Sequence, residues 1–176
     1  MTETSEDPLE GIRHENEVTS HLLDRLQDSV HRLRSGDSVS GDGILSLIEK
    51  LEAYHHRLHG TELMEGLLPE ARPVMMDTCA THLDDVARHY ADEGDVLRSL
   101  QDIVANHACD DPSSRKDLAD ILEHIILAER AAISHETDYP LTCLEAVLSD
   151  DARERLAKAR ERQREQRDRI EDTIGK

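Results

Sequence analysis

The sequence is rich in side chains that bind metal ions. It contains 11 histidines and 39 aspartates and glutamates in 176 residues. Imidazole nitrogens and carboxylate oxygens are the ligands that iron and zinc accept in proteins. The helical phase of the sequence singles out the following candidate metal ligands: His55, His59, Glu62, His82, His89, His124 and Glu129.

Three of these candidates belong to the segment 44–68, which has the pattern of an amphipathic helix. Its apolar face consists of Ile44, Ile48, Leu51 and Leu58. At 100° per residue, His55 and Glu62 fall at the centre of this face and His59 falls at its edge. Buried ionisable groups are costly unless they bind an ion or pair with each other. The pattern therefore predicts either one metal held by all three, or two core histidines bonded to Glu62 without metal.

The helices predicted at 74–107 and 115–135 carry the other candidates. His82 and His89, together with Glu93, lie along one flank of the first apolar face, where they either join a site or remain solvated. Glu129 falls squarely on the apolar face of the second helix, whereas His124 lies about a third of a turn away. A carboxylate on such a face needs a partner, and His124 and Glu129 together could still bind one ion from neighbouring positions.

The elements that would position these residues are helices. Asp7-Pro8 predicts the start of a helix that runs to about Arg34, with Asn16 and Thr19, but not His14, on its apolar face. Pro69 and Pro73 should end the second helix, and Gly94 should weaken or break the third. The run 137–140 should interrupt the chain before a short helix at 141–148. We therefore predict an all-α fold, an up-down four-helix bundle over residues 7–148.

The remaining segment, 149–176, differs from the rest in composition. Between residues 152 and 174 it is almost entirely Arg, Glu, Gln and Asp, with Leu156, Ile170 and Ile174 as the large apolar side chains. This is too little apolar surface to bury, so the pattern indicates an additional charged helix in solvent or a frayed tail. A helix that binds a protein partner or a second copy of the chain is the alternative.

The formal net charge of −18 limits the partners of this protein. Nucleic-acid phosphates and anionic lipids would be repelled, so neither is expected to bind. The acidic N-terminus does not resemble a signal peptide, and no apolar run reaches the roughly 18–20 residues of a membrane span, so we predict a cytoplasmic protein. Abundant carboxylates with scarce lysine are typical of a salt-loaded cytoplasm, so we also predict halophilic behaviour.

Three cysteines, Cys79, Cys109 and Cys143, are widely separated in the sequence. Their odd number and their spacing match neither a zinc motif nor a disulfide framework. A free cysteine packs as a small hydrophobic side chain, so we expect these residues to be buried, reduced thiols.

Four stretches of the chain resemble parts of a known family. They are Leu9–Val18, Tyr54–His56 followed by Glu62–Pro69, Glu123–Ile125 and Leu148–Arg153. Together they resemble the hemerythrin-like family, also called the HHE cation-binding domain, over about residues 7–171. The resemblance implies a four-helix bundle that holds a non-haem iron centre of one or two ions and that binds O₂ or NO or senses iron.

The metal motif of that family is matched in part. The corresponding residues are Asn16 for the first-helix His, His59 or Gly60 and Leu63 or Met64 for the second-helix pair, Ala91 for the third-helix His, and His124 with Glu129 for the fourth-helix pair. Two functions follow from this pattern: an iron-binding bundle with rearranged ligands, or a metal-free descendant that acts as an interaction or regulatory module. An enzyme has less support, because no nucleophile with an adjacent base stands out.

Overall fold

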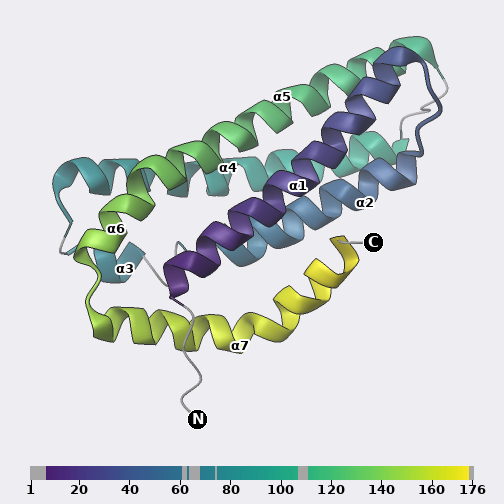
Figure 1. Cartoon of the computed structure of the whole chain (residues 1–176). Helices are drawn as coiled ribbons and strands as arrows, with labels where there is room; N and C mark the ends of the chain where they lie inside the picture. Colours follow the sequence, from purple (N-terminus) through teal and green to yellow (C-terminus); the bar gives the residue numbers. More distant parts are fainter. Residues whose placement is uncertain (1–6, 61–62, 64–67, 74, 107–110, 175–176) are drawn as a thin grey trace.

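The computed structural model describes residues 7–60, 63, 68–73, 75–106 and 111–174. Within these residues every regular element is a helix, and no strand is present (Figure 1). The predicted all-α class is therefore confirmed for the described part of the chain.

The first helix, α1, spans Pro8–Ser35 and has a capped residue at each end. The Asp7 carboxylate accepts a bond from the backbone N–H of Leu9 (3.1 Å), and Pro8 takes the first helical position, where its missing N–H has no partner to lose. Gly36, with φ of 79°, ends the helix and donates to the carbonyls of Arg32 and Leu33. The predicted bounds of this helix are confirmed to within a few residues.

The second predicted helix is built from two types of turn. The α-helix α2 covers Gly41–Leu51 and continues directly into η1, a π-helical segment over Glu52–Gly60. Ser40 caps α2 by accepting a bond from Gly43 N (3.2 Å). The short helix α3, Leu68–Ala71, contains Pro69 in its first turn and ends two residues before Pro73, whereas the predicted end of the second helix lies outside the described residues.

Helix α4, Asp77–Asn106, runs unbroken through Gly94, so the break that was predicted there does not occur. The glycine is buried against η1, and a Cβ at this position would lie 3.9 Å from His56 Nδ1. Packing along both sides of the helix, against α2 and η1 and against α5, supports the turn that the glycine weakens.

The chain also remains helical where a break was predicted at 137–140. Helix α5, Pro112–Glu136, starts at the cap residue Asp111 and leads into the π-helical segment η3, Thr137–Leu141, and then into α6, Thr142–Val147. Pro140 lies inside η3. A proline removes one backbone donor, and a locally widened helix is one of the ways in which a chain accommodates this loss.

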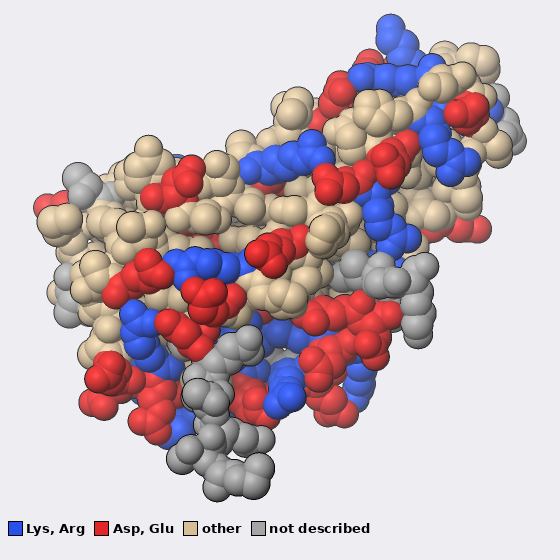
Figure 2. Space-filling view, in the orientation of Figure 1, with Lys and Arg blue, Asp and Glu red and all other residues tan. Residues whose placement is uncertain are grey.

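The charged segment forms α7, Asp150–Ile174, and its first turn is capped by Ser149. It lies along α1 and η1 (Figure 1). Figure 2 shows that the region of α7 presents mainly red and blue atoms, whereas tan atoms are frequent elsewhere on this face. No helix among the described residues combines the length and the apolar composition that a membrane span requires.

Helix α1 packs against α5 and α2, and α4 packs against the same two helices. Two apolar clusters fill the interior. The larger includes Leu22 to Leu33 of α1, Leu97 to Val104 of α4 and Leu118 to Ile126 of α5. The smaller includes Leu9 and Ile12 of α1, Leu83 to Tyr90 of α4 and Leu141 to Leu148 beyond α5. On α1 and α5, buried polar residues fall between these clusters, so a polar layer separates two apolar parts of one core.

A disulfide between Cys79 and Cys143 joins α4 to α6. The expectation of reduced thiols is therefore wrong for these two residues, and Cys109 lies outside the described residues. The two cysteines are 64 positions apart in the sequence, which gave no sign that they would meet. In the fold, α4 and α6 bring their Cα atoms to 6.2 Å, within the range that a disulfide spans.

Candidate metal centre

Two consecutive histidines of η1 meet one carboxylate of α5 in the polar layer. His55 Nδ1 lies 3.1 Å from Glu129 Oε2, and His56 Nε2 lies 2.8 Å from Glu129 Oε1. All three residues are buried, and each offers a ligand atom within 4.8 Å of the other two. His89 of α4 adds an imidazole at the margin, with Nε2 3.4 Å from Glu129 Oε2. The three central residues could together hold a metal ion.

The π-helical turn explains how neighbouring residues reach the same carboxylate. On an α-helix, successive side chains point about 100° apart, so His55 and His56 would face different neighbours. A π-helix has a wider turn, and such turns often occur at functional sites. In η1 the turn buries a run of polar side chains that includes both histidines and His59.

Tyr90 of α4 connects this group to a second carboxylate. Its hydroxyl lies 2.8 Å from His55 Nε2 and donates to Glu136 Oε2 at 2.8 Å. Burial and the nearby carboxylates raise the pKa of Tyr90, so the phenol keeps its proton. Glu136 also accepts a bond from Asn16 Nδ2 at 3.0 Å. Tyr90 and Asn16 therefore hold Glu136 in a defined orientation.

His59, also in η1, lies between two carboxylates. Its Nδ1 atom is 2.8 Å from Glu15 Oε2, and its Nε2 atom is 3.0 Å from Glu136 Oε1. Burial opposes a charge on His59, but the charge and the hydrogen bonds of Glu136 and Glu15 outweigh it and raise its pKa to about 10. In the absence of a metal ion, His59 is therefore an imidazolium that neutralises part of the carboxylate charge.

Two arginines of α7 reach the same carboxylate of α1. Arg160 Nη2 donates to Glu15 Oε1 at 2.8 Å, and Arg167 Nε lies 2.5 Å from that oxygen. Burial would raise the pKa of Glu15, but the bond from His59 and the charges of His59 and both arginines lower it to about 2. The carboxylates of Glu15 and Glu136 are thus paired with two guanidiniums and one imidazolium.

The electrostatics around Glu129 have a different balance. Burial favours its neutral form, yet the bonds from His55, His56 and His89 hold its pKa well below the ordinary value. Burial lowers the pKa of His55, against the opposing effect of Glu129. His55 is consequently a neutral imidazole beside a charged carboxylate, and a neutral imidazole is the form that binds metal ions.

The structure brings together four of the seven residues proposed from the sequence: His55, His59, His89 and Glu129. Glu62 lies outside the described residues, as does the side chain of Glu93. The other two candidates are placed elsewhere.

His82 and His124 were wrongly assigned to the site. His82 Nδ1 lies 2.9 Å from His135 Nε2, and its ring stacks on Tyr139, near the disulfide end of α4. His124 is exposed because it lies on the outer side of α5, five residues before Glu129. The phase that places Glu129 inward therefore turns His124 outward.

The helical pattern did not identify four residues of the buried polar layer: Glu15, His56, Tyr90 and Glu136. Glu136 follows Glu129 by seven residues and shares its face, so the signal was present but lay one residue beyond the predicted helix end. Tyr90 was not singled out, because a tyrosine at an apolar position of a helix is expected in the core. Glu15 and His56 had no comparable signal in the sequence. The position of His56 depends on a π-helical segment, and that of Glu15 on arginines of α7, and α-helical phase predicts neither.

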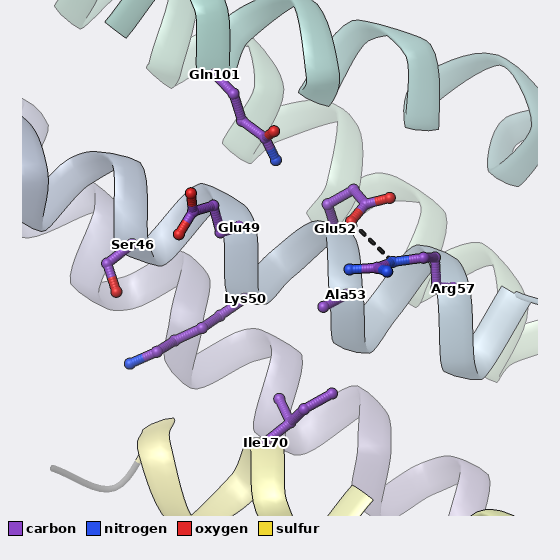
Figure 3. A pocket seen from close by; sticks show the side chains of 8 residues that line it. All are labelled: Ser46, Glu49, Lys50, Glu52, Ala53, Arg57, Gln101 and Ile170. Carbon is purple, nitrogen blue, oxygen red and sulfur yellow. Dashed lines mark ion pairs between the residues drawn. The ribbon is translucent and has the colours of Figure 1, made fainter. Parts of the chain in front are cut away.

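A separate cavity of about 450 Å³ lies between α2, η1, α4 and α7 (Figure 3). Its lining residues are Ser46, Glu49, Lys50, Glu52, Ala53, Arg57, Gln101 and Ile170. Glu52 and Arg57 form an ion pair across 3.0 Å, and Ile170 approaches from α7. The lining contains both signs of charge and none of the histidines of the buried layer.

Comparison of the chain with protein-family models, with curated proteins and with solved structures found no match.

Proposed function

We propose that this protein binds a transition-metal cation, iron by the preference of its ligands, in the buried layer around Glu129. The observation that supports this most strongly is the convergence of His55, His56 and Glu129, whose ligand atoms lie within 4.8 Å of one another in a buried position. Two imidazoles and a carboxylate from two helices resemble the ligand sets of non-haem iron proteins. Such a set leaves positions open for a small ligand.

The hydrogen bonds of His55 support metal binding at its Nδ1 atom. Tyr90 donates its single proton to Glu136, so a neutral His55 completes the chain when its Nε2–H donates to the Tyr90 hydroxyl. The lone pair of Nδ1 then faces Glu129 Oε2 across 3.1 Å. In the ion-free protein, the other tautomer donates Nδ1–H to Glu129, and a bound cation would take the place of that proton. A metal-binding histidine usually donates its other N–H to an outer partner, as His55 does to Tyr90 in this arrangement.

His56 supports the same conclusion from the other side of Glu129. Its Nδ1 atom is buried and has no hydrogen-bond partner among the described residues, while its Nε2 atom faces Glu129 Oε1. Within the described part of the chain, Asn16 Oδ1 is a second buried acceptor without a partner. Such atoms are uncommon in native interiors and often mark the place of an ion or a bound molecule.

A second ion could occupy the adjoining group of Glu15, His59 and Glu136. A cation that replaces a proton on one His59 nitrogen would gain that imidazole and the carboxylate that faces it, Glu15 at Nδ1 or Glu136 at Nε2. The two groups are connected through Tyr90, and the rings of His55 and His59 are 5.3 Å apart. The donor set is therefore large enough for a centre of one or two iron ions.

The arrangement of the helices supports a hemerythrin-like four-helix bundle. The contacts of α1 with α2 and α5, and of α4 with α2 and α5, close a ring of four long elements around the polar layer. By this resemblance we propose that the centre binds O₂ or NO, or senses iron. The ligands themselves differ from the family motif, since Asn16 stands where α1 would supply a histidine.

A metal-free interaction module is the alternative function. It is favoured by the charge balance beside the Glu129 group, where the carboxylates of Glu15 and Glu136 meet two arginines and the His59 imidazolium. Such a network is satisfied without an ion. On this view α7, whose outer face is densely charged, would be the surface that a partner protein binds (Figure 2).

Metal analysis separates the two functions. The protein should be purified without oxygen, stripped with a chelator and titrated with Fe²⁺ while the bound metal and the optical spectrum are recorded. We expect at least one ion per chain in the wild type and its loss in Glu129→Gln. Glu123→Gln, on the outer side of the same helix, should bind as the wild type does. A wild-type chain that retains no Fe²⁺, Zn²⁺ or Mn²⁺ would favour the metal-free module.

A further inference from the structure

The contact between α7 and Glu15 is unusual for so polar a helix. Most α7 side chains are exposed, yet Arg167 retains only 6% of its surface, and Arg160 is partly buried beside it. Both arginines meet Glu15, which is 1% exposed and belongs to the polar layer. A helix that served only to cover the bundle would not need to place two charges in the interior.

The two oxygens of Glu15 have separate partners. Oε1 receives both guanidiniums, at 2.8 Å from Arg160 and 2.5 Å from Arg167. Oε2 is left to His59 Nδ1, at 2.8 Å. The arginines therefore fix the orientation of the carboxylate and direct its second oxygen toward His59. A metal-binding carboxylate is oriented in this way by outer groups that bind one of its oxygens and leave the other directed at the metal.

Helix α1 provides space for this contact at Gly11. A Cβ atom at Gly11 would lie 2.4 Å from Arg160 Nη2 and 2.6 Å from Arg160 Cζ. The guanidinium thus rests against the α1 backbone one turn before Glu15. Any side chain larger than hydrogen would displace the Arg160 head group, although the backbone of α1 would remain helical.

We propose that α7 is part of the metal centre: Arg160 and Arg167 are positioning residues that hold Glu15 ready to bind a cation beside His59. This inference rests on the proposed function and extends it to the C-terminal helix. Because coupling between two binding events is reciprocal, a cation bound beside Glu15 should also strengthen the docking of α7 on α1. The centre would then report its occupancy through the exposure of α7.

Other contacts keep α7 in place when one arginine is altered. Tyr54 donates to Glu171 at 2.5 Å, and Arg153 pairs with Asp7 at 2.9 Å. Leu156 is buried in the smaller apolar cluster. Single substitutions of Arg160 or Arg167 should therefore yield a folded chain with a changed orientation of Glu15.

The test is an anaerobic Fe²⁺ titration of the full chain, with Arg160→Met, Arg167→Met and Gly11→Ala as variants. Loss of an outer partner of a metal ligand typically weakens affinity about 10–100-fold, and we expect this loss in all three. Arg164→Met is the matched control, because Arg164 is exposed and pairs only within α7 in the described contacts. Arg167→Lys, which keeps the charge, should recover part of the affinity.

Hydrogen exchange supplies the second measurement. In the wild type, Fe²⁺ should slow backbone exchange in residues 150–174, and Glu15→Gln should abolish this effect. Two results would refute the inference about α7 and leave the proposed function standing. One is an unchanged Fe²⁺ affinity in the three variants. The other is a wild-type protein that binds Fe²⁺ without any change in the hydrogen exchange of α7. A wild type that binds no Fe²⁺ would refute the proposed function as well.

Discussion

His55 and His56 are adjacent in the chain, yet both direct a ring nitrogen at Glu129, one to each carboxylate oxygen, at 3.1 and 2.8 Å. The π-helical segment η1 makes this pairing geometrically feasible. The consequence is a buried carboxylate flanked by two imidazoles, which is the core of the proposed centre.

Substitution of His56 should weaken cation binding, whereas substitution of His124 should not. His56→Ala removes a nitrogen beside Glu129, and we expect an affinity loss of more than about tenfold, equivalent to ~1.4 kcal/mol. His124 is exposed on α5, so His124→Ala should bind as the wild type does. Calorimetric titration with Zn²⁺ measures both affinities. Equal losses in the two variants would contradict the assignment.

The stability of the cation-free protein should fall on both sides of a mildly acidic optimum. The pKa of His59 rises from 6.5 to about 10, so its contribution is complete below pH 6.5 and disappears as the pH rises through about 10. The pKa of Glu15 falls from 4.5 to about 2, so its contribution is complete above pH 4.5 and disappears as the pH falls through about 2. The lowered pKa of His55 costs stability below its ordinary value of 6.5, so the optimum should lie near pH 6.5.

Denaturant unfolding at constant ionic strength, with chelator present, measures this profile. His59→Gln should flatten the alkaline side, because glutamine carries no proton to lose. A wild-type protein that gains stability between pH 6.5 and 10 would show that His59 is not held as an imidazolium.

Reduction of the disulfide should destabilise the fold. The bond between Cys79 and Cys143 closes a loop with a sequence separation of 64, for which the loss of chain entropy in the unfolded state corresponds to about 4 kcal/mol. We expect Cys79→Ser and treatment with a reductant to lower the melting temperature to the same extent. A reductant that lowers the melting temperature of Cys79→Ser further would indicate another cause.

Salt should stabilise the fold. At a formal net charge of −18, carboxylates repel one another in dilute buffer, and added ions screen this repulsion. The melting temperature should rise between low and multimolar KCl. A melting temperature that is indifferent to KCl would refute the halophilic prediction.

Amphipathic periodicity and capping residues were sufficient to predict the helices. Asp7, Pro8 and Gly36 set the bounds of α1 through local chemistry, and local chemistry is visible in a sequence. The errors at Gly94 and Pro140 have one cause. Each residue weakens a helix by itself, and contacts from distant helices outweigh that weakness.

The site was less predictable than the fold, because it depends on long-range contacts. Glu129 was foreseeable as a carboxylate on an apolar face. Glu15 appeared to be an ordinary acidic residue, since its partners Arg160 and Arg167 are about 150 positions away and lie in a segment expected to be solvated. His56 required knowledge of the π-helical turn, which no residue pattern in 52–60 indicates.

The central claim is that a cation binds between His55, His56 and Glu129. The most direct test is anomalous X-ray diffraction from crystals of the Fe²⁺-loaded protein, with data collected on both sides of the iron absorption edge. We predict an anomalous peak about 2.0–2.2 Å from a nitrogen of each histidine and from an oxygen of Glu129. An Fe²⁺-treated crystal with these three side chains bonded to each other, and with no anomalous peak among them, would contradict the account.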